Sequence, residues 1–283
     1  FSAFFPFVRV VRLECGARTR WNIYKLWSFV DMSSQNGQND LTEAPMIEAD
    51  GLCKFYGDFA AVRDVSFKIY KGEVVAFLGP NGAGKSTTMK LLTGYLAPSS
   101  GSAQIAGHDM ATDRLAGSAR LGYLPENGPL YPEMTPLGLL QFFAEARELP
   151  ARQIAERIDA VTNLCGLRDV LRKPIGKLSK GYRQRIGMAH ALLHEPDVLI
   201  LDEPTAGLDP NQITDVRNRL RQLGEEKTIL LSTHILQEVE AMADRVIFIH
   251  NGCLAFDGLL DELCSQGESL DAVFAKVTSA EIP

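Results

Sequence analysis

Continuous apolar runs along the chain predict buried strands. Residues 74–78 and residues 198–201 are entirely apolar, and each run has the length of a strand. Residues 229–232 predict a third strand of this kind. Between Met46 and Ile69, shorter apolar stretches joined by turns predict an antiparallel β region that leads into this core.

Residues 125–176 show helical spacing instead. One helix is predicted to begin at Thr135 and Pro136, an N-cap residue followed by proline at the first helical position. A second helix is predicted to follow Pro150 and to end at Gly166. The apolar positions that indicate the two helices are Leu139, Leu140, Phe142, Phe143 and Ala146 in the first, and Ile154, Ile158, Val161 and Leu164 in the second. We therefore expect a helical insert that interrupts an α/β domain.

Residues 1–31 differ from the rest of the chain. They are rich in apolar and basic residues without clear helical periodicity, and Met32 then opens a polar linker. We expect this segment to be translated upstream sequence, and residues 1–45 as a whole to lie outside the fold. A membrane-surface segment or a targeting peptide is the alternative, although the apolar stretch is short and is interrupted by Arg9.

Composition narrows the class of partner. The chain is 46% hydrophobic and 23% charged, with a formal charge of −6 and no block of basic residues, so we expect no nucleic-acid partner. The cysteines are scattered without a Cys-x-x-Cys pair, which indicates neither a disulfide framework nor a zinc site and suits a reducing compartment. No run reaches the roughly 18 apolar residues of a transmembrane helix, so any membrane role needs another chain.

The first candidate for chemistry is the glycine-rich segment directly behind the first apolar run. It consists of Gly79, Pro80, Asn81, Gly82, Ala83, Gly84, Lys85, Ser86 and Thr87. Its spacing is that of a P-loop, whose amides and following helix N-terminus bind phosphates. We expect Lys85 to contact the β- and γ-phosphates of a nucleotide and Ser86 to hold Mg²⁺. An accidental glycine-rich turn is the alternative, and the strand before the segment and the helix after it argue against that.

Acidic and polar residues follow the other two apolar runs. Asp202 and Glu203 end the second run. Ligands bind at the carboxyl ends of strands in open α/β sheets, so Asp202 can reach Mg²⁺ beside Ser86. Glu203 is then placed to orient or deprotonate an attacking water. His234 follows the third run and can reach the γ-phosphate. A solvated acid pair is the alternative, and the phosphate-binding loop favours the catalytic interpretation.

An aromatic residue ahead of the loop is a further candidate. Tyr56 precedes the loop by some twenty residues, and an exposed ring there is placed to stack on adenine. Core packing is the alternative for this side chain.

The order of these motifs resembles that of the ATP-binding subunit of an ABC transporter, over residues 46 to about 275. The matching positions are Tyr56 for the adenine-stacking aromatic, 79–87 for Walker A, 178–182 for the signature, 198–202 for Walker B, Glu203 for the catalytic glutamate, Asp209 for the D-loop and His234 for the switch histidine. Two departures stand out. Glu126 occupies the place of the usual glutamine, and Lys180 and Tyr182 lie in the signature. Neither removes an evident catalytic group, and we expect Glu126 to present a carboxylate oxygen to Mg²⁺ or to the water.

The resemblance implies the fold class and the domain organisation. The fold class is α/β, a P-loop NTPase core of ABC type with an antiparallel β region and an inserted helical subdomain. The ATP-binding domain would span residues 46–283. Within it, residues 46–124 and 177–283 would form the α/β core and residues 125–176 the helical subdomain.

The resemblance also implies a mechanism and partners. Two such domains, either two copies or one copy with a homologous ATPase subunit, would close head to tail over ATP and Mg²⁺. Ser179 and Gly181 of one subunit, with its Asp209 nearby, would then meet the γ-phosphate held by Lys85 of the other. Hydrolysis would release the closed pair. Separate integral membrane permease subunits would contact the helical subdomain and the loop at Glu126. The chain would then lie peripherally on the cytoplasmic face of the plasma (inner) membrane.

Three segments resemble ABC-2-type exporters, closest to the gliding-motility branch. These are residues 131–135, 211–213 and 269–274. A soluble ABC ATPase that acts on ribosomes or nucleic acid is the alternative, and the sequence lacks the second cassette, long heptad insertion and basic face that would favour it. A P-loop kinase or GTPase would not need the signature at 178–182. The transported substrate is recognised by the membrane subunits, so this sequence does not specify it.

Overall fold

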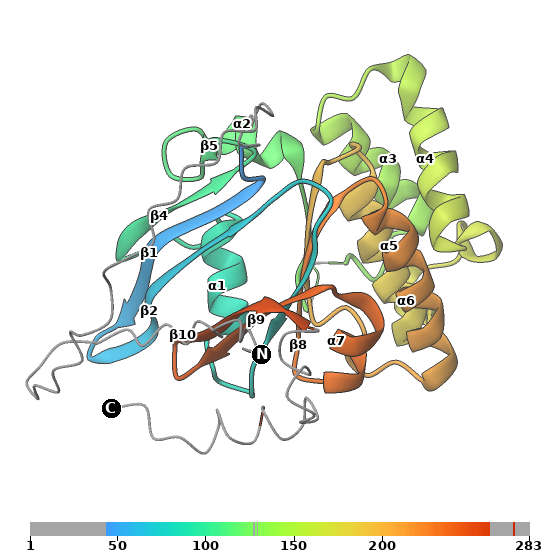
Figure 1. Ribbon diagram of the computed structural model, residues 1–283. Helices are drawn as coiled ribbons and strands as arrows, with labels where there is room; N and C mark the ends of the chain where they lie inside the picture. The colour runs from blue at the N-terminus through green and yellow to red at the C-terminus, as the bar shows by residue number, and fades with distance from the viewer. Residues whose placement is uncertain (1–43, 127, 129, 261–273, 275–283) are drawn as a thin grey trace, which may run out of the picture.

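The computed structural model describes residues 44–126, 128, 130–260 and 274 (Figure 1). Residues 1–31 lie outside the described residues, so the expectation for that segment stays a prediction. The same holds for residues 269–273 of the tail.

An antiparallel sheet is built from the first half of the described chain. Its strand order is β2-β1-β4-β5, with β1 (Ile47–Tyr56), β2 (Phe59–Ile69), β4 (Ser100–Ile105) and β5 (His108–Asp109). Ile47 of β1 lies opposite Ile69 of β2 and Ile105 of β4, and all three side chains are fully buried. This apolar row fixes the register, because a slip by one residue would turn it towards solvent.

A second, mostly parallel sheet carries the strand ends of interest. Its order is β10-β9-β3-β8-β7-β6, with β3 (Val74–Leu78), β6 (Leu121–Leu124), β7 (Val198–Asp202), β8 (Thr228–Thr233), β9 (Arg245–His250) and β10 (Cys253–Leu259). Only the pairing of β10 with β9 is antiparallel within this sheet. The three strands predicted from apolar runs, β3, β7 and β8, are neighbours in the middle and are buried along their whole length.

Side chains of the central strands alternate between two hydrophobic cores. Val75 and Phe77 of β3 pack with the antiparallel sheet and α1 (Lys85–Leu92). Ala76 and Leu78 pack on the opposite face with the helices that follow. A strand covered on both faces has no polar side, which explains why the sequence shows a continuous apolar run there.

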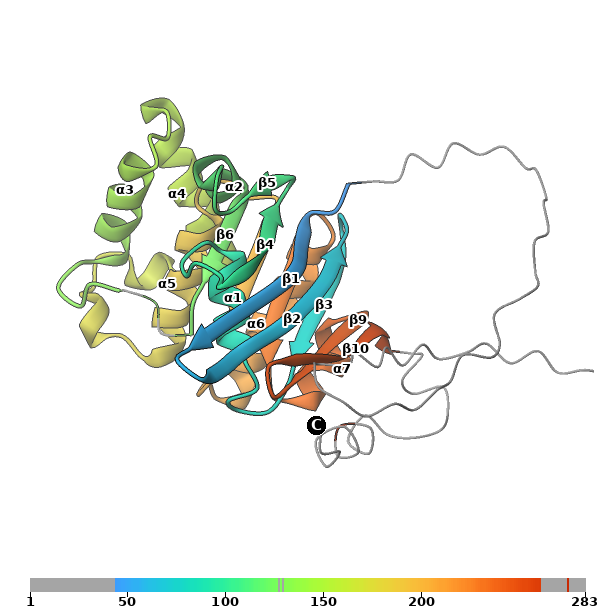
Figure 2. The ribbon, with the colours of Figure 1, turned by 90° about the vertical axis from the view of Figure 1, so that its left-hand side faces the viewer.

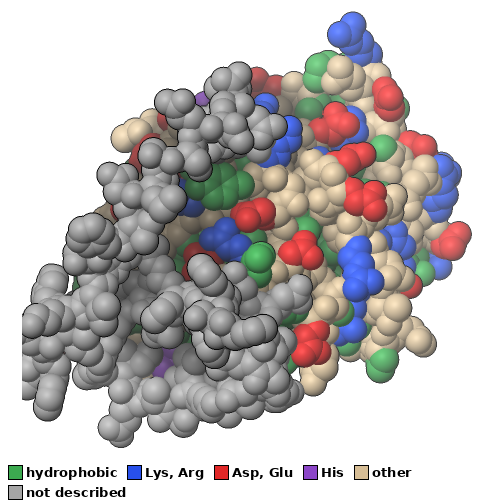
Figure 3. Space-filling view, viewed as in Figure 1, with side chains coloured by type: hydrophobic (Ala, Val, Ile, Leu, Met, Phe, Trp, Pro, Cys, Tyr) green, Lys and Arg blue, Asp and Glu red, His purple; other side chains and the backbone are tan. Residues whose placement is uncertain are grey.

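The helices occupy both faces of the parallel sheet. Outside the insert they are α1, α2 (Arg114–Arg120), α5 (Lys180–Leu192), α6 (Pro210–Gly224) and α7 (Leu236–Met242). α1 contacts strands of both sheets and lies between them, whereas α5 and α6 cover the other side (Figures 1 and 2). On the face seen in Figure 3, acidic and basic side chains are interspersed over this helical side, as on an ordinary solvated surface.

The helical insert contains α3 (Pro136–Ala146), α4 (Ala151–Cys165) and the short 3₁₀ turns η1 (Arg168–Val170) and η2 (Ile175–Lys177). The predicted ends are confirmed. Thr135 caps α3 by accepting a hydrogen bond from Gly138 N at 3.2 Å, and Gly166 ends α4 with a left-handed φ of 62°. None of the described helices is long and apolar enough to cross a bilayer.

The apolar positions of α3 do not all face the core. Phe142 is 50% exposed and Ala146 is exposed, whereas Ala144 is fully buried beside Leu139 and Leu140. The buried stripe of α3 is therefore narrower than the apolar pattern. The fold class itself is confirmed.

Candidate active site

The glycine-rich loop joins the end of β3 to the start of α1. Gly84 is the N-cap of α1 with a φ of 107°, and a Cβ on it would lie 2.6 Å from the carbonyl oxygen of Ala61. Only glycine fits both the conformation and the space. Within the described chain, the backbone N–H groups of residues 84–87 have no acceptor. These amides stand at the positive end of α1, which is a ready site for an anion.

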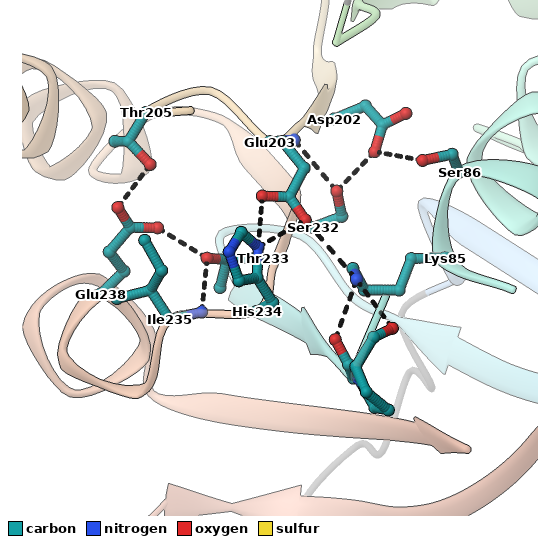
Figure 4. A network of polar contacts seen from close by, with 12 residues as sticks. Lys85, Ser86, Asp202, Glu203, Thr205, Ser232, Thr233, His234, Ile235 and Glu238 are labelled. Carbon is teal, nitrogen blue, oxygen red and sulfur yellow. Dashed lines mark hydrogen bonds and ion pairs between the residues drawn. The ribbon is translucent and has the colours of Figure 1, made fainter. Parts of the chain in front are cut away.

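Lys85 is the first side chain of α1 and is 6% exposed. Its Nζ donates to the carbonyl oxygens of Gly79 at 2.8 Å and Pro80 at 3.2 Å. It also lies 3.5 Å from Oε1 of Glu203 (Figure 4). The ammonium group is therefore held inside the loop, directed towards the end of β7.

Ser86 and Asp202 are brought together across the loop. Ser86 Oγ lies 3.1 Å from Asp202 Oδ1, which also accepts a bond of 2.6 Å from Ser232 Oγ (Figure 4). Asp202 ends β7 opposite Ser232 of β8 and is 1% exposed. The parallel register of β7 and β8 thus sets the carboxylate at the mouth of the loop.

Glu203 is held in an uncommon backbone conformation. Its φ is 51°, in the left-handed region that side chains other than glycine seldom adopt. Its N–H bonds to the carbonyl oxygen of Ser232 at 3.2 Å and to Ser232 Oγ at 3.0 Å. Such local strain clusters at functional sites. The conformation turns the carboxylate back over the loop instead of into solvent.

His234 is the second partner of the Glu203 carboxylate. Its Nδ1 lies 2.8 Å from Oε2 and 3.1 Å from Oε1 (Figure 4). The Glu203 carboxylate is thus shared by the Lys85 ammonium on one side and the His234 ring on the other. The histidine ring is 42% exposed, so this pair lies at the edge of the site.

Sequence reasoning missed a buried carboxylate behind these residues. Glu238 in α7 is completely buried and accepts hydrogen bonds from the hydroxyls of Thr205 and Thr233 (Figure 4). A signal existed in the sequence. Glu238 lies at helical spacing among Ile235, Val239 and Met242, and a carboxylate on an apolar helix face needs polar partners.

The remaining predicted residues lie apart from this cluster. Ser179 and Asp209 are exposed N-caps of α5 and α6, and accept bonds from Tyr182 N and Gln212 N. Gly181 packs against the side chain of Gln212, so the two helix N-termini adjoin.

Two predicted ligand contacts are at the surface. Tyr56 is 53% exposed at the end of β1, with Lys54 Nζ 5.5 Å from its ring centre. Glu126 is exposed and has no hydrogen bond or ion pair to any described residue.

The donor set fits a nucleotide with Mg²⁺. Within the described residues, no three His, Cys, Asp or Glu side chains form a metal-binding cluster. Mg²⁺ needs no such cage, since it is commonly bound through one or two protein oxygens together with substrate phosphates. Ser86 Oγ and Asp202 Oδ1 are hard oxygen donors beside a loop with free amides, which is the required combination.

Comparison with known proteins supplies the family. The ABC transporter family model matches residues 62–206. The ABC transporter ATP-binding protein NatA of Bacillus subtilis is 41% identical over 219 residues, 76% of this chain and 89% of NatA. Nod factor export ATP-binding protein I of Ralstonia nicotianae is 36% identical over 230 residues, 81% of this chain and 72% of that protein. The structure of an ATP-binding subunit of an ABC transporter superposes with a TM-score of 0.75 at 33% identity, covering 82% of this chain and 99% of the other. A phosphate-binding loop, a Walker B acid pair and relatives of this similarity lead to one conclusion: the chain belongs to the ABC transporter family, as an ATP-binding subunit that hydrolyses ATP.

Proposed function

We propose that this subunit hydrolyses ATP with Mg²⁺ at the loop 79–87 and thereby drives an ABC-2-type exporter. The observation that carries the proposal is that the buried ammonium group of Lys85 and the buried carboxylates of Asp202 and Glu203 lie together beside one loop. Catalysis of phosphoryl transfer depends mainly on positioning and charge neutralisation, and this cluster supplies both.

Each side chain has a distinct role in this proposal. Ser86 and Asp202 hold Mg²⁺, which when bound neutralises charge on the β- and γ-phosphates. Lys85 binds the same phosphates, for which it leaves Glu203 and the loop carbonyl oxygens. Glu203 orients the attacking water and accepts its proton, and His234 holds the Glu203 carboxylate in place.

ATP binding rearranges the contacts seen around Lys85. The γ-phosphate and the Glu203 carboxylate are both anions and compete for one ammonium group. Arrival of the γ-phosphate releases Glu203 from Lys85, while the contact with His234 remains available. The carboxylate is then free to meet a water molecule.

A second subunit completes the site. Ser179 and Asp209 are exposed at adjoining helix N-termini and make no bond to the Lys85 cluster, so within one chain they contribute nothing to it. In a head-to-tail pair, Ser179 and Gly181 of one subunit close over the γ-phosphate held by the other, with Asp209 at the same interface. The second subunit is another copy of this chain or a homologous ATPase. Tyr56 stacks on the adenine at the rim.

Separate integral membrane permeases receive the motion, at the cytoplasmic face of the plasma (inner) membrane. The helical insert and the loop around Glu126 are the surfaces assigned to this contact. The similarity to a Nod factor export ATP-binding protein of Ralstonia nicotianae supports the exporter direction. The gliding-motility branch is the narrowest form of this proposal and depends on the segments 131–135, 211–213 and 269–274.

Lys85→Ala tests the phosphate-binding role, with the exposed Lys71→Ala as the matched control. ATP hydrolysis and equilibrium binding of a fluorescent ATP analogue are measured for both variants and the parent. We expect Lys85→Ala to lose hydrolysis by at least about 100-fold, as for removal of a preorganised charge-stabilising donor, while Lys71→Ala remains at the parental rate. Equal rates for the two variants would refute the proposed site.

A further inference from the structure

Glu238 is a fully buried carboxylate with no ion-pair partner in the described part of the chain. It belongs to the first turn of α7. Thr233 Oγ1 donates to its Oε2 at 2.6 Å, and the Thr205 hydroxyl donates to its Oε1. Burial of a carboxylate costs stability unless its oxygens are hydrogen-bonded, so both threonines are needed to hold it there.

The two threonines belong to the segments that carry the proposed catalytic residues. Thr205 lies two residues after Glu203, in the turn that leads from β7 to α6, and is 3% exposed. Thr233 ends β8, immediately before His234, and is fully buried. One carboxylate therefore connects the backbone behind Glu203 with the backbone behind His234.

The connection also sets the direction of the chain at His234. While Thr233 Oγ1 donates to Glu238, the same oxygen accepts a bond of 3.1 Å from Ile235 N. The peptide group after His234 is thus tied to the side-chain hydroxyl of the residue before it. A different rotamer of Thr233 would break both bonds and would change where the imidazole ring points.

We infer that Glu238 is a positioning residue for hydrolysis: it clamps Thr205 to Thr233 and so keeps His234 against the Glu203 carboxylate. Glu238 itself does not touch the nucleotide. The inference rests on the roles proposed above for Glu203 and His234. A purely structural carboxylate would stabilise the fold without this dependence on His234.

Glu238→Gln is the first test, because the amide keeps the shape but replaces one acceptor oxygen with a donor. We expect kcat to fall at least about tenfold, because a catalytic group displaced by about 1 Å can lower the rate by about 100-fold. The Kd of a fluorescent ATP analogue should not change. Glu240→Gln, on the exposed face of the same helix, is the matched control and should keep the parental kcat. Thr205→Val should lower kcat and Thr205→Ser should restore it, since serine keeps the hydroxyl. These two variants also cover the case in which Glu238→Gln does not fold.

A double-mutant cycle with His234→Ala separates positioning from general destabilisation. If Glu238 acts through His234, then Glu238→Gln should change kcat by less than about twofold in the His234→Ala background. The imidazole that Glu238 positions is already absent there, so its loss has little left to affect. An equal fall in kcat in both backgrounds would overturn the inference, as would a parental kcat in Glu238→Gln alone. If instead Glu203→Gln and His234→Ala hydrolyse ATP at the parental rate, the proposed function fails first and the inference falls with it.

Discussion

At the scale of single residues, the site is arranged around charges that satisfy one another. Lys85 is bound by two carbonyl oxygens and lies beside Glu203, while Asp202 is bound by two serine hydroxyls. The left-handed φ of Glu203 keeps its carboxylate within this set. Neighbouring acids thus have different partners, so they should fail in different ways when neutralised.

Asp202→Asn and Glu203→Gln test this difference. Asp202→Asn removes a proposed Mg²⁺ ligand. The Mg²⁺ concentration for half-maximal ATP binding should therefore rise at least about tenfold, because loss of even a residue that supports a metal ligand lowers metal affinity by about that factor. Glu203→Gln leaves the Mg²⁺ titration unchanged but should lower kcat at least about 100-fold, the lower end of positioned acid–base help. Identical Mg²⁺ titrations in the two variants would show that Asp202 does not hold the metal.

Glu126→Gln tests the exposed acid that replaces the family's usual glutamine. Glu126 has no partner among the described residues, so the thermal midpoint should not change. Opposite charges about 4 Å apart interact by about 4 kcal/mol at an effective dielectric near 20, partly offset by desolvation, so Glu126→Gln should weaken apparent Mg²⁺ affinity. ATP turnover should stay measurable. An unchanged Mg²⁺ titration would mean that Glu126 does not approach the metal.

At the scale of elements, the pattern of apolar residues predicted the strands that are buried on both faces, and the capping residues predicted where two helices begin or end. The apolar runs within β3, β7 and β8 arise because both faces of these strands are covered. Thr135 marks a helix start through its side-chain hydroxyl, and Gly166 marks a helix end through its left-handed backbone. The exposure of Phe142 could not be predicted, since an apolar residue on a helix rim looks like one in the core. Glu238 was missed because one of its two threonine partners, Thr205, lies 33 residues away in the sequence, so the spacing around α7 does not reveal it.

Two partly buried histidines, His190 in α5 and His194 just after that helix, should make stability depend on pH. Burial, with the charge of Arg147 nearby, lowers the pKa of His190 and of His194 to about 4. The unfolded chain binds these protons near pH 6.5 and the folded chain does not. The stability that comes from keeping these histidines neutral in the folded chain is therefore fully present above pH 6.5. It falls by about 1.4 kcal/mol per pH unit for each histidine as the pH drops towards 4.

Thermal midpoints at pH 7 and pH 5 check this expectation. The thermal midpoint of the parent should fall by several degrees from pH 7 to pH 5. That of His190→Gln should fall by less, because one of the two proton-binding groups is gone. His108→Gln is the control, since that ring lies at the surface beside Asp113. The same loss of midpoint in the parent and in His190→Gln would contradict the buried-histidine explanation.

At the scale of the whole molecule, the two sets of residues that we propose as half-sites do not meet within one chain. Lys85, Asp202 and Glu203 form one set, and the exposed helix N-termini at Ser179 and Asp209 form the other. Motif spacing predicted both sets, because each depends on a local strand end or helix start. It could not predict the pairing of Lys85 with Glu203, which depends on how the loop and β7 are placed in space.

The composite site is the central claim, and size-exclusion chromatography of Glu203→Gln with and without Mg·ATP tests it most directly. This variant keeps the phosphate loop and the exposed Ser179 but lacks the proton acceptor, so ATP should bind and persist between two subunits. We predict a monomer without nucleotide and a dimer with Mg·ATP, together with a hydrolysis rate at least about 100-fold below the parent. A slow variant that stays monomeric with Mg·ATP would contradict the composite site, and hydrolysis at the parental rate would remove Glu203 from catalysis.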